Sequence, residues 1–232
     1  MPPSDKTILL VGASRGLGLA MAAEYLRQGW TVIGTVRGAV RTGLHELADA
    51  HAGRVEIETL DILNAGQTAA LRQRLAGRRL DALFVNAGVS NDPAETVADV
   101  TTEEFTRVMV TNALSPMRVI EALEDLVAPD GLIGVMSSGQ GSVTNNTRGL
   151  REVYRSSKAA LNQFMRSFAA RHEGDPRAMV VMAPGWVRTD LGGPEAPLTI
   201  ADSIPSLVQV LLAAPGAPGL RYLDYLGRTV PW

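Results

Sequence analysis

The sequence predicts a parallel, doubly wound α/β sheet of about seven strands in a single domain, with helices on both faces. Three observations lead to this fold class. The chain has 232 residues, 46% of them hydrophobic and 20% charged, which suits one globular unit of ordinary composition. Short apolar runs rich in β-branched residues alternate with longer helical patterns along the chain. A glycine-rich turn joins the first apolar run to the first helical pattern.

The strands are expected at the apolar runs, and the helices are expected between them. Each helical pattern is long enough to cross over the sheet and return the chain for a parallel pairing. The expected strands are 7–12, 31–36, 55–60, 80–87, 132–138, 178–185 and 220–225, and the expected helices are 16–28, 41–51, 64–76, 102–127 and 152–173.

Two of the helix starts carry local signals. Thr101 is followed three residues later by Glu104, and Asn64 is followed by Gln67. Both pairs are interpreted as capping boxes, in which each side chain bonds to the other residue's backbone.

The long helix expected at 102–127 contains Pro116. Proline has no N–H to donate to the carbonyl of Asn112, so the helix is predicted to kink or loosen near Asn112. The break could free polar groups beside a cleft, or it could be a harmless bend.

Charge and composition exclude several classes of function. The formal net charge is −2, and the 22 Lys and Arg residues are spread along the chain, so a nucleic-acid partner is not expected. The chain has no cysteine, and His45, His51 and His172 lack the spacing of a metal motif, so no metal is expected. The N-terminal apolar run is too short for a signal peptide or a membrane span, which favours a cytoplasmic protein without a membrane partner.

The turn after the first strand places Gly12, Gly16 and Gly18 before the first helix. Glycine permits positive φ, a close approach of backbone to a pyrophosphate, and tight packing of helix on strand. The N-terminus of the helix then offers free N–H groups and a positive dipole end to an anion. By itself the triplet could be a plain turn, but its place in the first βα unit favours phosphate binding.

The spacing G-x-x-x-G-x-G is the form carried by short-chain dehydrogenases and reductases, and further motifs strengthen the resemblance. "VNAG" at 85–88, "YRSSK" at 154–158 and "PGWVRT" at 184–189 follow in the family's order, so that the match covers nearly the whole chain. The sequence most resembles the small carbonyl reductases grouped with the C-factor proteins. This resemblance implies a Rossmann-type fold and a nicotinamide cofactor.

The resemblance also assigns residues to that cofactor. Asn86 is expected to steady the central sheet near the ribose. Asp61 is expected to meet the adenine ring, although it could instead cap the next helix. The cofactor-binding residues implied are Gly12, Ser14, Arg15, Gly16, Leu17, Gly18, Arg37, Asp61, Ile62, Asn86, Ala87, Gly88, Tyr154, Lys158, Pro184, Gly185, Val187 and Thr189.

Two arginines indicate which nicotinamide cofactor is used. Sites for NAD usually have an acidic residue after the second strand, whereas this strand is followed by Arg37. Arg15 lies inside the glycine turn, and two planar guanidinium groups suit the extra phosphate of NADP(H). The alternative is that both arginines are solvated surface residues.

Tyr154 and Lys158 lie four residues apart in an expected helix, so their side chains share a face. An ammonium about 4 Å from a phenolate would stabilise it by roughly 4 kcal/mol, or about three pKa units before desolvation is subtracted. The pair could then act as a general acid and base. By resemblance, Tyr154 protonates the substrate oxygen, Lys158 holds the nicotinamide ribose, and Asn112 connects Lys158 to solvent through a water.

The resemblance implies a catalytic serine, but its position departs from the usual pattern. The register found in many family members falls on Gly141. Ser138 is favoured because it lies at the end of the fifth strand, as the second of two paired serines. Ser137 and Ser142 remain possible, because the insertion at 144–152 changes the spacing.

These residues together imply reduction of a ketone or aldehyde with NADPH. The alternatives are a binding protein with a regulatory role and little turnover, and oxidation of a secondary alcohol. Residues about 190–212 are expected to form a mobile lid that ends in a short helix. The family commonly associates through the helices expected here at 102–127 and 152–173, which favours a homodimer or homotetramer.

Overall fold

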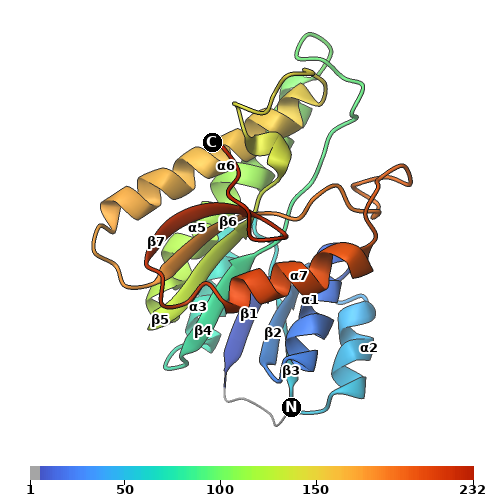
Figure 1. Cartoon of the computed structure of the whole chain (residues 1–232). Helices are drawn as coiled ribbons and strands as arrows, with labels where there is room; N and C mark the ends of the chain where they lie inside the picture. The colour runs from blue at the N-terminus through green and yellow to red at the C-terminus, as the bar shows by residue number, and fades with distance from the viewer. Residues whose placement is uncertain (1–5) are drawn as a thin grey trace.

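The structure is a computed structural model that describes residues 6–232. Seven strands form one sheet in the order β3-β2-β1-β4-β5-β6-β7, and every neighbouring pair is parallel (Figure 1). The predicted fold class is therefore confirmed. The strands are β1 Thr7–Val11, β2 Thr31–Val36, β3 Val55–Thr59, β4 Leu80–Val85, β5 Val127–Met136, β6 Ala178–Ala183 and β7 Gly219–Asp224.

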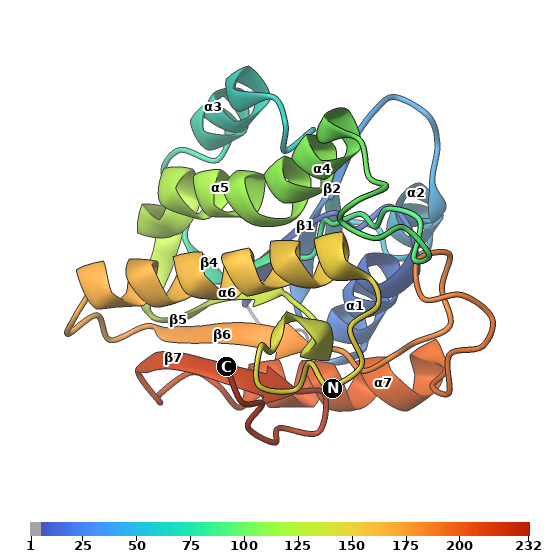
Figure 2. The ribbon, with the colours of Figure 1, turned by 90° about the horizontal axis from the view of Figure 1, so that it is seen from above.

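Helices cover both faces of the sheet, and Figure 2 shows the two layers from above. One face carries α1 Gly16–Arg27, α2 Gly43–Ala50 and α7 Ile200–Leu212. The other carries α3 Ala65–Arg74, α5 Ser115–Leu123 and α6 Glu152–Arg171, with α4 Thr102–Met109 packed against α6. In the described part of the chain, no helix is both long and apolar enough to cross a bilayer.

Two apolar cores lie on opposite sides of the sheet, as β1 illustrates. Ile8 and Leu10 pack against α1, α2 and α7, whereas Leu9 and Val11 pack against α3, α5 and α6. Successive side chains of a strand point to opposite faces, so a strand covered on both sides needs an uninterrupted apolar run. This is why the buried strands read as short apolar runs in the sequence.

The helix expected at 102–127 is interrupted. After α4 the chain forms a π-helical turn, η1 (Val110–Leu114), and Pro116 is the second residue of α5. The loosened turn lies where Pro116 predicts it, because the carbonyl of Asn112 receives no proline N–H. A short 3₁₀ turn, η2 (Glu124–Leu126), ends this region, and Val127 already pairs with Leu80 in β5. The prediction that the helix reaches residue 127 was wrong, because sheet pairing takes over at Val127.

The two predicted capping boxes form only in half. The side chains of Asn64 and Thr101 accept the backbone N–H of the third residue of α3 and α4. The return bonds are absent, because the Gln67 amide oxygen accepts the N–H of Asp61 and the Glu104 carboxylate pairs with Arg107. Each helix keeps its N-cap without the reciprocal contact.

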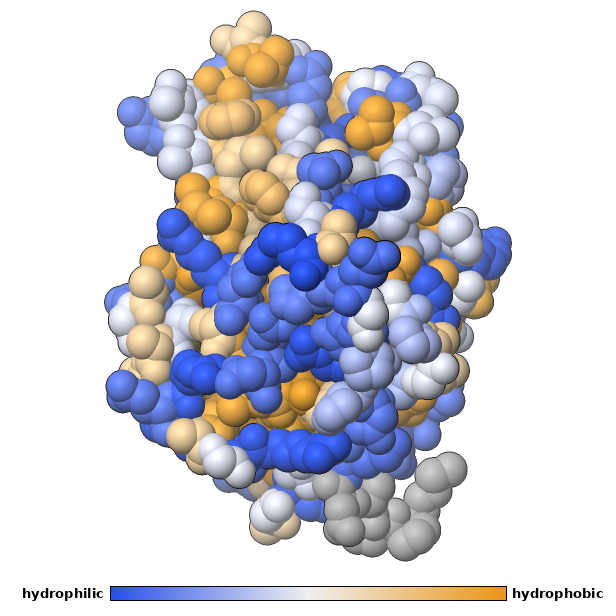
Figure 3. All heavy atoms as spheres, turned by 90° about the vertical axis from the view of Figure 1, so that its left-hand side faces the viewer, coloured by the Kyte–Doolittle hydropathy of each residue, from blue (hydrophilic) through white to orange (hydrophobic). Residues whose placement is uncertain are grey.

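The surface shown in Figure 3 is uneven in polarity. Hydrophilic side chains cover much of the lower half of this side, whereas apolar side chains gather in the upper half. The exposed large apolar residues of the molecule include Phe105 on α4, Leu114 on η1 and Phe164 on α6. Contiguous exposed apolar surface commonly marks an interaction site.

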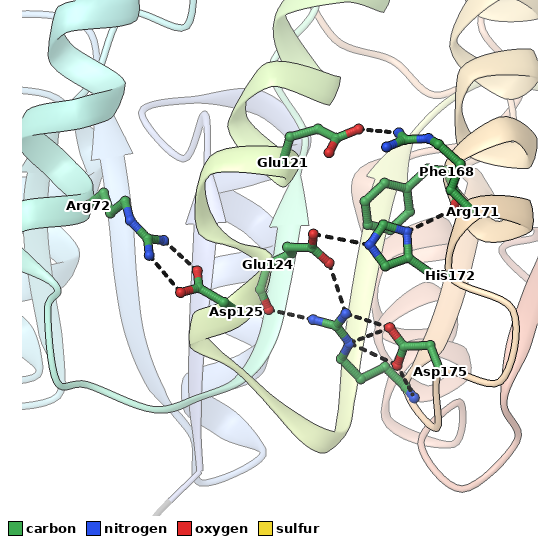
Figure 4. A network of polar contacts seen from close by, with 9 residues as sticks. Arg72, Glu121, Glu124, Asp125, Phe168, Arg171, His172 and Asp175 are labelled. Carbon is green, nitrogen blue, oxygen red and sulfur yellow. Dashed lines mark hydrogen bonds and ion pairs between the residues drawn. The ribbon is translucent and has the colours of Figure 1, made fainter.

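A network of charged groups ties the helices together at the end of the sheet where β5 and β6 begin (Figure 4). Arg177 bonds to the carbonyl and carboxylate of Glu124 and to Asp175. The Arg177 guanidinium lowers the pKa of the Asp175 carboxyl through these hydrogen bonds. Arg72 of α3 pairs with Asp125 on the other side of η2. The strand ends opposite this network are left free for a site.

Residues 190–212, the expected lid, divide into two parts. Residues 200–212 form α7, and its buried Ile204, Leu207, Val208 and Leu211 belong to one of the two cores. Thr199 and Asp202 form a reciprocal capping box that fixes the start of this helix. Only the loop before Thr199 lies outside the packed core, so the proposal of a movable lid is confined to 190–199.

Candidate active site

A cleft of about 930 Å³ opens at the carboxyl ends of the strands. It lies where β1 has β2 on one side and β4 on the other, which is the point where a doubly wound sheet reverses its strand order. Loops from both halves of the sheet surround this point without filling it. Of the residues predicted from the sequence, those lining the cleft are Gly12, Ser14, Arg15, Gly16, Leu17, Arg37, Asp61, Ile62, Asn86, Ala87, Gly88, Ser138, Tyr154, Lys158, Pro184, Gly185, Val187 and Thr189.

Gly18 and Asn112 are the two predicted residues outside this lining, and both support it from behind. Gly18 is buried under the glycine turn, where an added Cβ would lie 2.0 Å from the carbonyl oxygen of Gly12. Gly12 has φ of +87°, and an added Cβ there would come within 2.9 Å of the Ala87 amide nitrogen. The turn therefore leaves no room for side chains at these positions, and backbone forms this wall of the cleft.

Asn86 holds the glycine turn against β4. Its side-chain amide donates to the carbonyl of Gly12 over 2.8 Å, while the Gly12 N–H donates to the Thr35 hydroxyl over 2.9 Å. These two bonds tie the turn to β2 and to the end of β4. The N-terminus of α1, which begins at Gly16, is thus fixed at the edge of the cleft.

The expected phosphate-binding arginines differ in their surroundings. Arg37 is exposed and has no ion pair among the described residues, so its guanidinium is free to meet an anion. Arg15 pairs with Asp190 across the mouth of the cleft at 2.5 Å, with both side chains more than two thirds exposed. An exposed pair of this kind is worth little energetically and exchanges readily for another partner.

Asp61 does not cap α3. Asn64 holds that position, and the Asp61 carboxylate accepts the N–H of Leu63 over 3.0 Å while lining the cleft. The capping alternative considered for Asp61 is therefore wrong, because the chain needs three more residues before the first helical turn.

Tyr154, Ser138 and Lys158 lie together at the other end of the cleft. Burial raises the pKa of the Tyr154 phenol, and a hydrogen bond with Ser138 and the charge of Arg151 lower it to a smaller extent. Burial also lowers the pKa of Lys158 to about 8. The expected lowering of the phenol pKa by Lys158 is not found, because burial raises this pKa and the groups that lower it are Ser138 and Arg151. An ordinary phenol, with a pKa of about 10, is already protonated at neutral pH, and burial makes its proton harder to remove.

Lys158 is 3% exposed, and its ammonium donates to the carbonyl of Met136 over 2.9 Å. The ammonium nitrogen lies 5.9 Å from the centre of the Tyr154 ring. A Cβ added to Gly88 would lie 3.3 Å from this nitrogen and 3.3 Å from Oδ1 of Asn112. Lys158 and Asn112 therefore face the same small space beside Gly88.

Asn112 is fully buried and joins three segments. Its Oδ1 accepts the N–H of Val89 over 2.8 Å, and its amide donates to the carbonyl of Val89 and the hydroxyl of Ser157. The π-helical turn places this side chain between the loop after β4 and the helix that carries Tyr154 and Lys158. Through these contacts Asn112 holds the loop after β4 against α6, next to Lys158.

The three serines considered for the catalytic position differ in their surroundings. Ser137 also lines the cleft, but it is buried and its hydroxyl donates to Asn162 over 2.6 Å. Ser142 is buried, bonds to the Trp232 carbonyl and lies outside the cleft lining. Ser138 is half-buried, lines the cleft and bonds to Tyr154. Its hydroxyl also accepts the N–H of Gln140 at the start of η3 (Gly139–Gly141), which fixes its direction.

Several cleft residues were missed in the sequence analysis. Arg151 precedes α6 in the 144–152 insertion, Gln140 lies on η3, and Trp186 and Leu191 lie on the loop after β6. Loop residues carry no periodic signal. Only the closeness of Arg151 to Tyr154 in the sequence could have indicated its place.

The comparisons with known proteins agree with this geometry. Residues 6–197 match the sequence profile of the family described as short chain dehydrogenase. The chain belongs to the short-chain dehydrogenase family. This family assignment covers the glycine turn, the Tyr154–Lys158 pair and the turn at Pro184 in one domain.

Two solved structures of this family are especially similar to the chain. A Burkholderia multivorans protein described as a short-chain dehydrogenase/reductase, solved with bound NADP, is 63% identical with a TM-score of 0.97 over 99% of this chain and 100% of that chain. A Pseudomonas aeruginosa carbonyl reductase in complex with NADP is 34% identical, with a TM-score of 0.90 over 99% of this chain and 100% of that chain. The C-signal of Myxococcus xanthus is 36% identical over 66% of this chain and 93% of its own length.

Proposed function

We propose that the chain is an NADPH-dependent reductase that converts a ketone or aldehyde to an alcohol. The observation that carries this proposal is the group formed by Tyr154, Ser138 and Lys158 at one end of a cleft whose other end is the glycine turn. Two family members of high structural similarity hold NADP, and one of them is a carbonyl reductase. The cleft volume of about 930 Å³ suits a dinucleotide with a small substrate.

The residues of the cleft fit NADP(H). The backbone of the turn at Gly12 and the N-terminus of α1 would hold the pyrophosphate, because they present N–H groups and no side-chain bulk. Arg37 and, after release from Asp190, Arg15 would hold the 2′-phosphate. When bound, NADPH supplies the hydride for the substrate carbon.

Tyr154 would donate the proton that the substrate oxygen needs. Its phenol is protonated at neutral pH, as an ordinary phenol is, and burial raises its pKa further. Ser138 would bond to the same oxygen and orient it, since its hydroxyl lies beside the phenol. Lys158 lies behind the ring and would return a proton to the phenol through the space it shares with Asn112. The protonated phenol is the form that reduction needs, because it can donate its proton to the substrate oxygen.

The experiment is NADPH oxidation by the purified protein over a panel of ketones, aldehydes and quinones. Tyr154→Phe is expected to lower kcat by about 10²- to 10⁴-fold, because the proton donor is removed. Tyr225→Phe is the matched control, since Tyr225 lines the same cleft outside the Ser138–Lys158 group. Equal rates for wild type and Tyr154→Phe would contradict the proposed mechanism.

Arg37 tests the cofactor preference in the same assay. Arg37→Gln is expected to raise the KM for NADPH by about tenfold or more and to leave the KM for NADH unchanged, because only NADPH carries the 2′-phosphate. Equal preference for both cofactors in the wild type would contradict the choice of NADP(H).

The resemblance to C-signal favours a second candidate, a regulatory protein that binds NADP(H) with little turnover. Tight NADPH binding by calorimetry, together with no turnover over the panel and no change of affinity in Tyr154→Phe, would favour this candidate.

We also propose a homo-oligomer, since Phe105, Leu114 and Phe164 are 39%, 37% and 42% exposed on the α4–α6 side. Light scattering after size exclusion measures the assembly directly, and a monomer would overturn this part.

A further inference from the structure

The cations of the cleft divide into paired and unpaired groups. Arg15, Arg107 and Arg228 pair with Asp190, Glu104 and Asp224, and Lys158 donates to a backbone carbonyl. Within residues 6–232, the guanidinium groups of Arg37 and Arg151 have neither a carboxylate nor a hydrogen-bond acceptor. Arg37 follows β2 at the end of the cleft assigned to the cofactor phosphate. Arg151 lies at the opposite end, next to Tyr154.

Arg151 is placed close to the reacting phenol. Its guanidinium carbon lies 5.7 Å from the centre of the Tyr154 ring, and Lys158 lies 5.9 Å from the same centre. The charge of Arg151 is felt by the phenol, whose pKa it lowers. Two cations therefore lie near the Tyr154 ring. Lys158 is buried and hydrogen-bonded, whereas Arg151 is half-buried and lines the cleft.

The backbone around Arg151 is held by contacts that leave its side chain free. Leu150 and Arg151 have φ of 40° and 58°, the two positive values among non-glycine residues that the structure describes. Arg155 donates to the carbonyl of Leu150 over 2.8 Å, and its own N–H donates to the carbonyl of Arg151. The adjacent acid, Glu152, accepts the N–H of Val97 over 2.8 Å. The neighbouring carboxylate is thus bonded elsewhere, and it forms no ion pair with Arg151 in the described part of the chain.

We propose that Arg151 binds a carboxylate of the substrate, so that the carbonyl compound reduced is an oxo acid. This inference rests on the proposed function and deepens it by naming the substrate class. A guanidinium matches a carboxylate with two parallel N–H···O bonds, and this fixes the orientation of the bound acid. The N-terminus of α6, which begins directly after Arg151, adds to the positive potential at this place. Arg151 is a specificity-determining residue in this arrangement.

The reaction leaves the carboxylate unchanged. The carbonyl carbon gains a hydride and its oxygen gains the Tyr154 proton, which solvent replaces. The oxo acid becomes a hydroxy acid while NADPH is oxidised to NADP⁺. The two unpaired arginines then bind two different anions. Arg37 binds the phosphate of the cofactor, and Arg151 binds the carboxylate of the substrate.

The test compares each acid with its own methyl ester, using 3-oxobutanoate and 4-oxopentanoate with NADPH. The wild type is expected to show a kcat/KM for at least one acid that is about 10- to 100-fold above that of its ester, as for a charge-assisted hydrogen bond. Arg151→Gln is expected to remove this preference mainly through the KM of the acid, with the ester changed less than about twofold. Arg151→Lys is expected to restore part of it.

Arg148→Gln is the matched control, because Arg148 is exposed in the same loop and lies outside the cleft lining. It removes the same charge and is expected to leave the preference for the acid intact. If acid and ester lose kcat together in Arg151→Gln, with a shifted pH profile, Arg151 acts on Tyr154 and the inference is wrong. A wild type that prefers the esters also overturns it.

Binding gives a second readout that does not need turnover. Calorimetry of the NADP⁺ complex with 4-hydroxypentanoate is expected to show binding that weakens about tenfold or more in Arg151→Gln and not in Arg148→Gln. The carboxylate site is overturned if wild type and Arg151→Gln bind 4-hydroxypentanoate with equal affinity. It is also overturned if neither protein binds this acid. Absence of carbonyl reduction with intact, Arg151-dependent binding would instead overturn the proposed function and leave the site standing.

Discussion

Gly18 lies where the first turn of α1 passes beneath the glycine turn, and a side chain there would collide with backbone. An added Cβ would lie 2.0 Å from the Gly12 carbonyl oxygen and 2.6 Å from the Asn86 side-chain nitrogen. Gly18→Ala is therefore expected to destabilise the protein by about 1–3 kcal/mol and to weaken NADP binding, because the turn must move away from α1. Gly38→Ala, at a position with no atom within 4 Å, is the control. Urea unfolding and calorimetry measure both effects, and equal stability of the two variants would contradict the expectation.

Lys158 gives a pH dependence of stability with a definite sign. Its pKa is about 8 in the folded protein and 10.5 as a free side chain. Between these values the unfolded chain binds a proton that the folded chain does not, so the free energy of unfolding rises with pH by up to about 1.4 kcal/mol per unit. Below pH about 8 both states bind the proton and the contribution of Lys158 is constant.

The measurement is the difference in unfolding free energy between the wild type and Lys158→Met, taken by urea titration at pH about 7.5 and about 9.5. The difference is expected to shift in favour of the wild type at the higher pH. Tyr154 and the other tyrosines are present in both proteins, so their titration largely cancels. A difference that is independent of pH would show that the folded ammonium is solvated.

At the scale of elements, the π-helical turn η1 contacts the helix that carries Tyr154 and Lys158. Asn112 on this turn bonds to both backbone groups of Val89 and to Ser157, which precedes Lys158. An unbroken α-helix through 102–127 would have a different residue at this point of the helix face. The proline that loosens the helix therefore also decides which side chain reaches α6.

Asn112→Leu keeps the branched shape of asparagine and removes the bonds to the N–H and carbonyl of Val89. It also removes the bond to the Ser157 hydroxyl, which still donates to the Tyr154 carbonyl. The expected loss is at least about 1–3 kcal/mol of unfolding free energy, since buried unpaired groups are costly. The amide of Val89 is expected to exchange its hydrogen faster, because its acceptor is gone. Asn112→Asp keeps the acceptor and is expected to restore the protection of Val89 in hydrogen-exchange measurements. Unchanged exchange in Asn112→Leu would mean that Val89 has another acceptor.

At the scale of the whole molecule, the last residues of the chain connect β7, α6 and the loop after β5. The ring centres of Trp232 and Tyr222 lie 5.2 Å apart. The guanidinium carbon of Arg166 lies 4.8 Å from the centre of the Trp232 ring. The carbonyl of Trp232 accepts from Thr144 and Ser142 in the loop that leads to Arg151. The loop beside the cleft is thus fixed by residues about 90 positions away in the chain.

Trp232→Ala is expected to lower the unfolding free energy by about 1–3 kcal/mol, because it removes a partly buried aromatic ring from its contacts with Tyr222 and Arg166. It is also expected to loosen residues 142–151 and to raise the KM of the substrate more than that of NADPH. Steady-state kinetics with thermal unfolding measure both, and equal changes of the two KM values would contradict the local effect on the loop.

The sequence alone determined the layered parallel sheet with helices on both faces, and the glycine turn after the first strand. These features follow from local rules, because apolar periodicity, proline and glycine act over a few residues. The resemblance also named Tyr154, Lys158 and Ser138 as one group, and all three line the cleft. The sequence left the choice among Ser137, Ser138 and Ser142 open, and the proposal of Ser138 rests on the contacts that each serine makes in the fold.

Tertiary structure alone decided the rest. It set the direction of the Tyr154 pKa, since burial depends on segments far apart in the sequence and outweighs the lowering by Ser138 and Arg151. It divided the expected lid into a loop and a packed helix, α7, because helix burial is decided by what lies beneath it. It also brought Arg151 to the cleft without a carboxylate partner, a matter of distance and charge that no local pattern encodes.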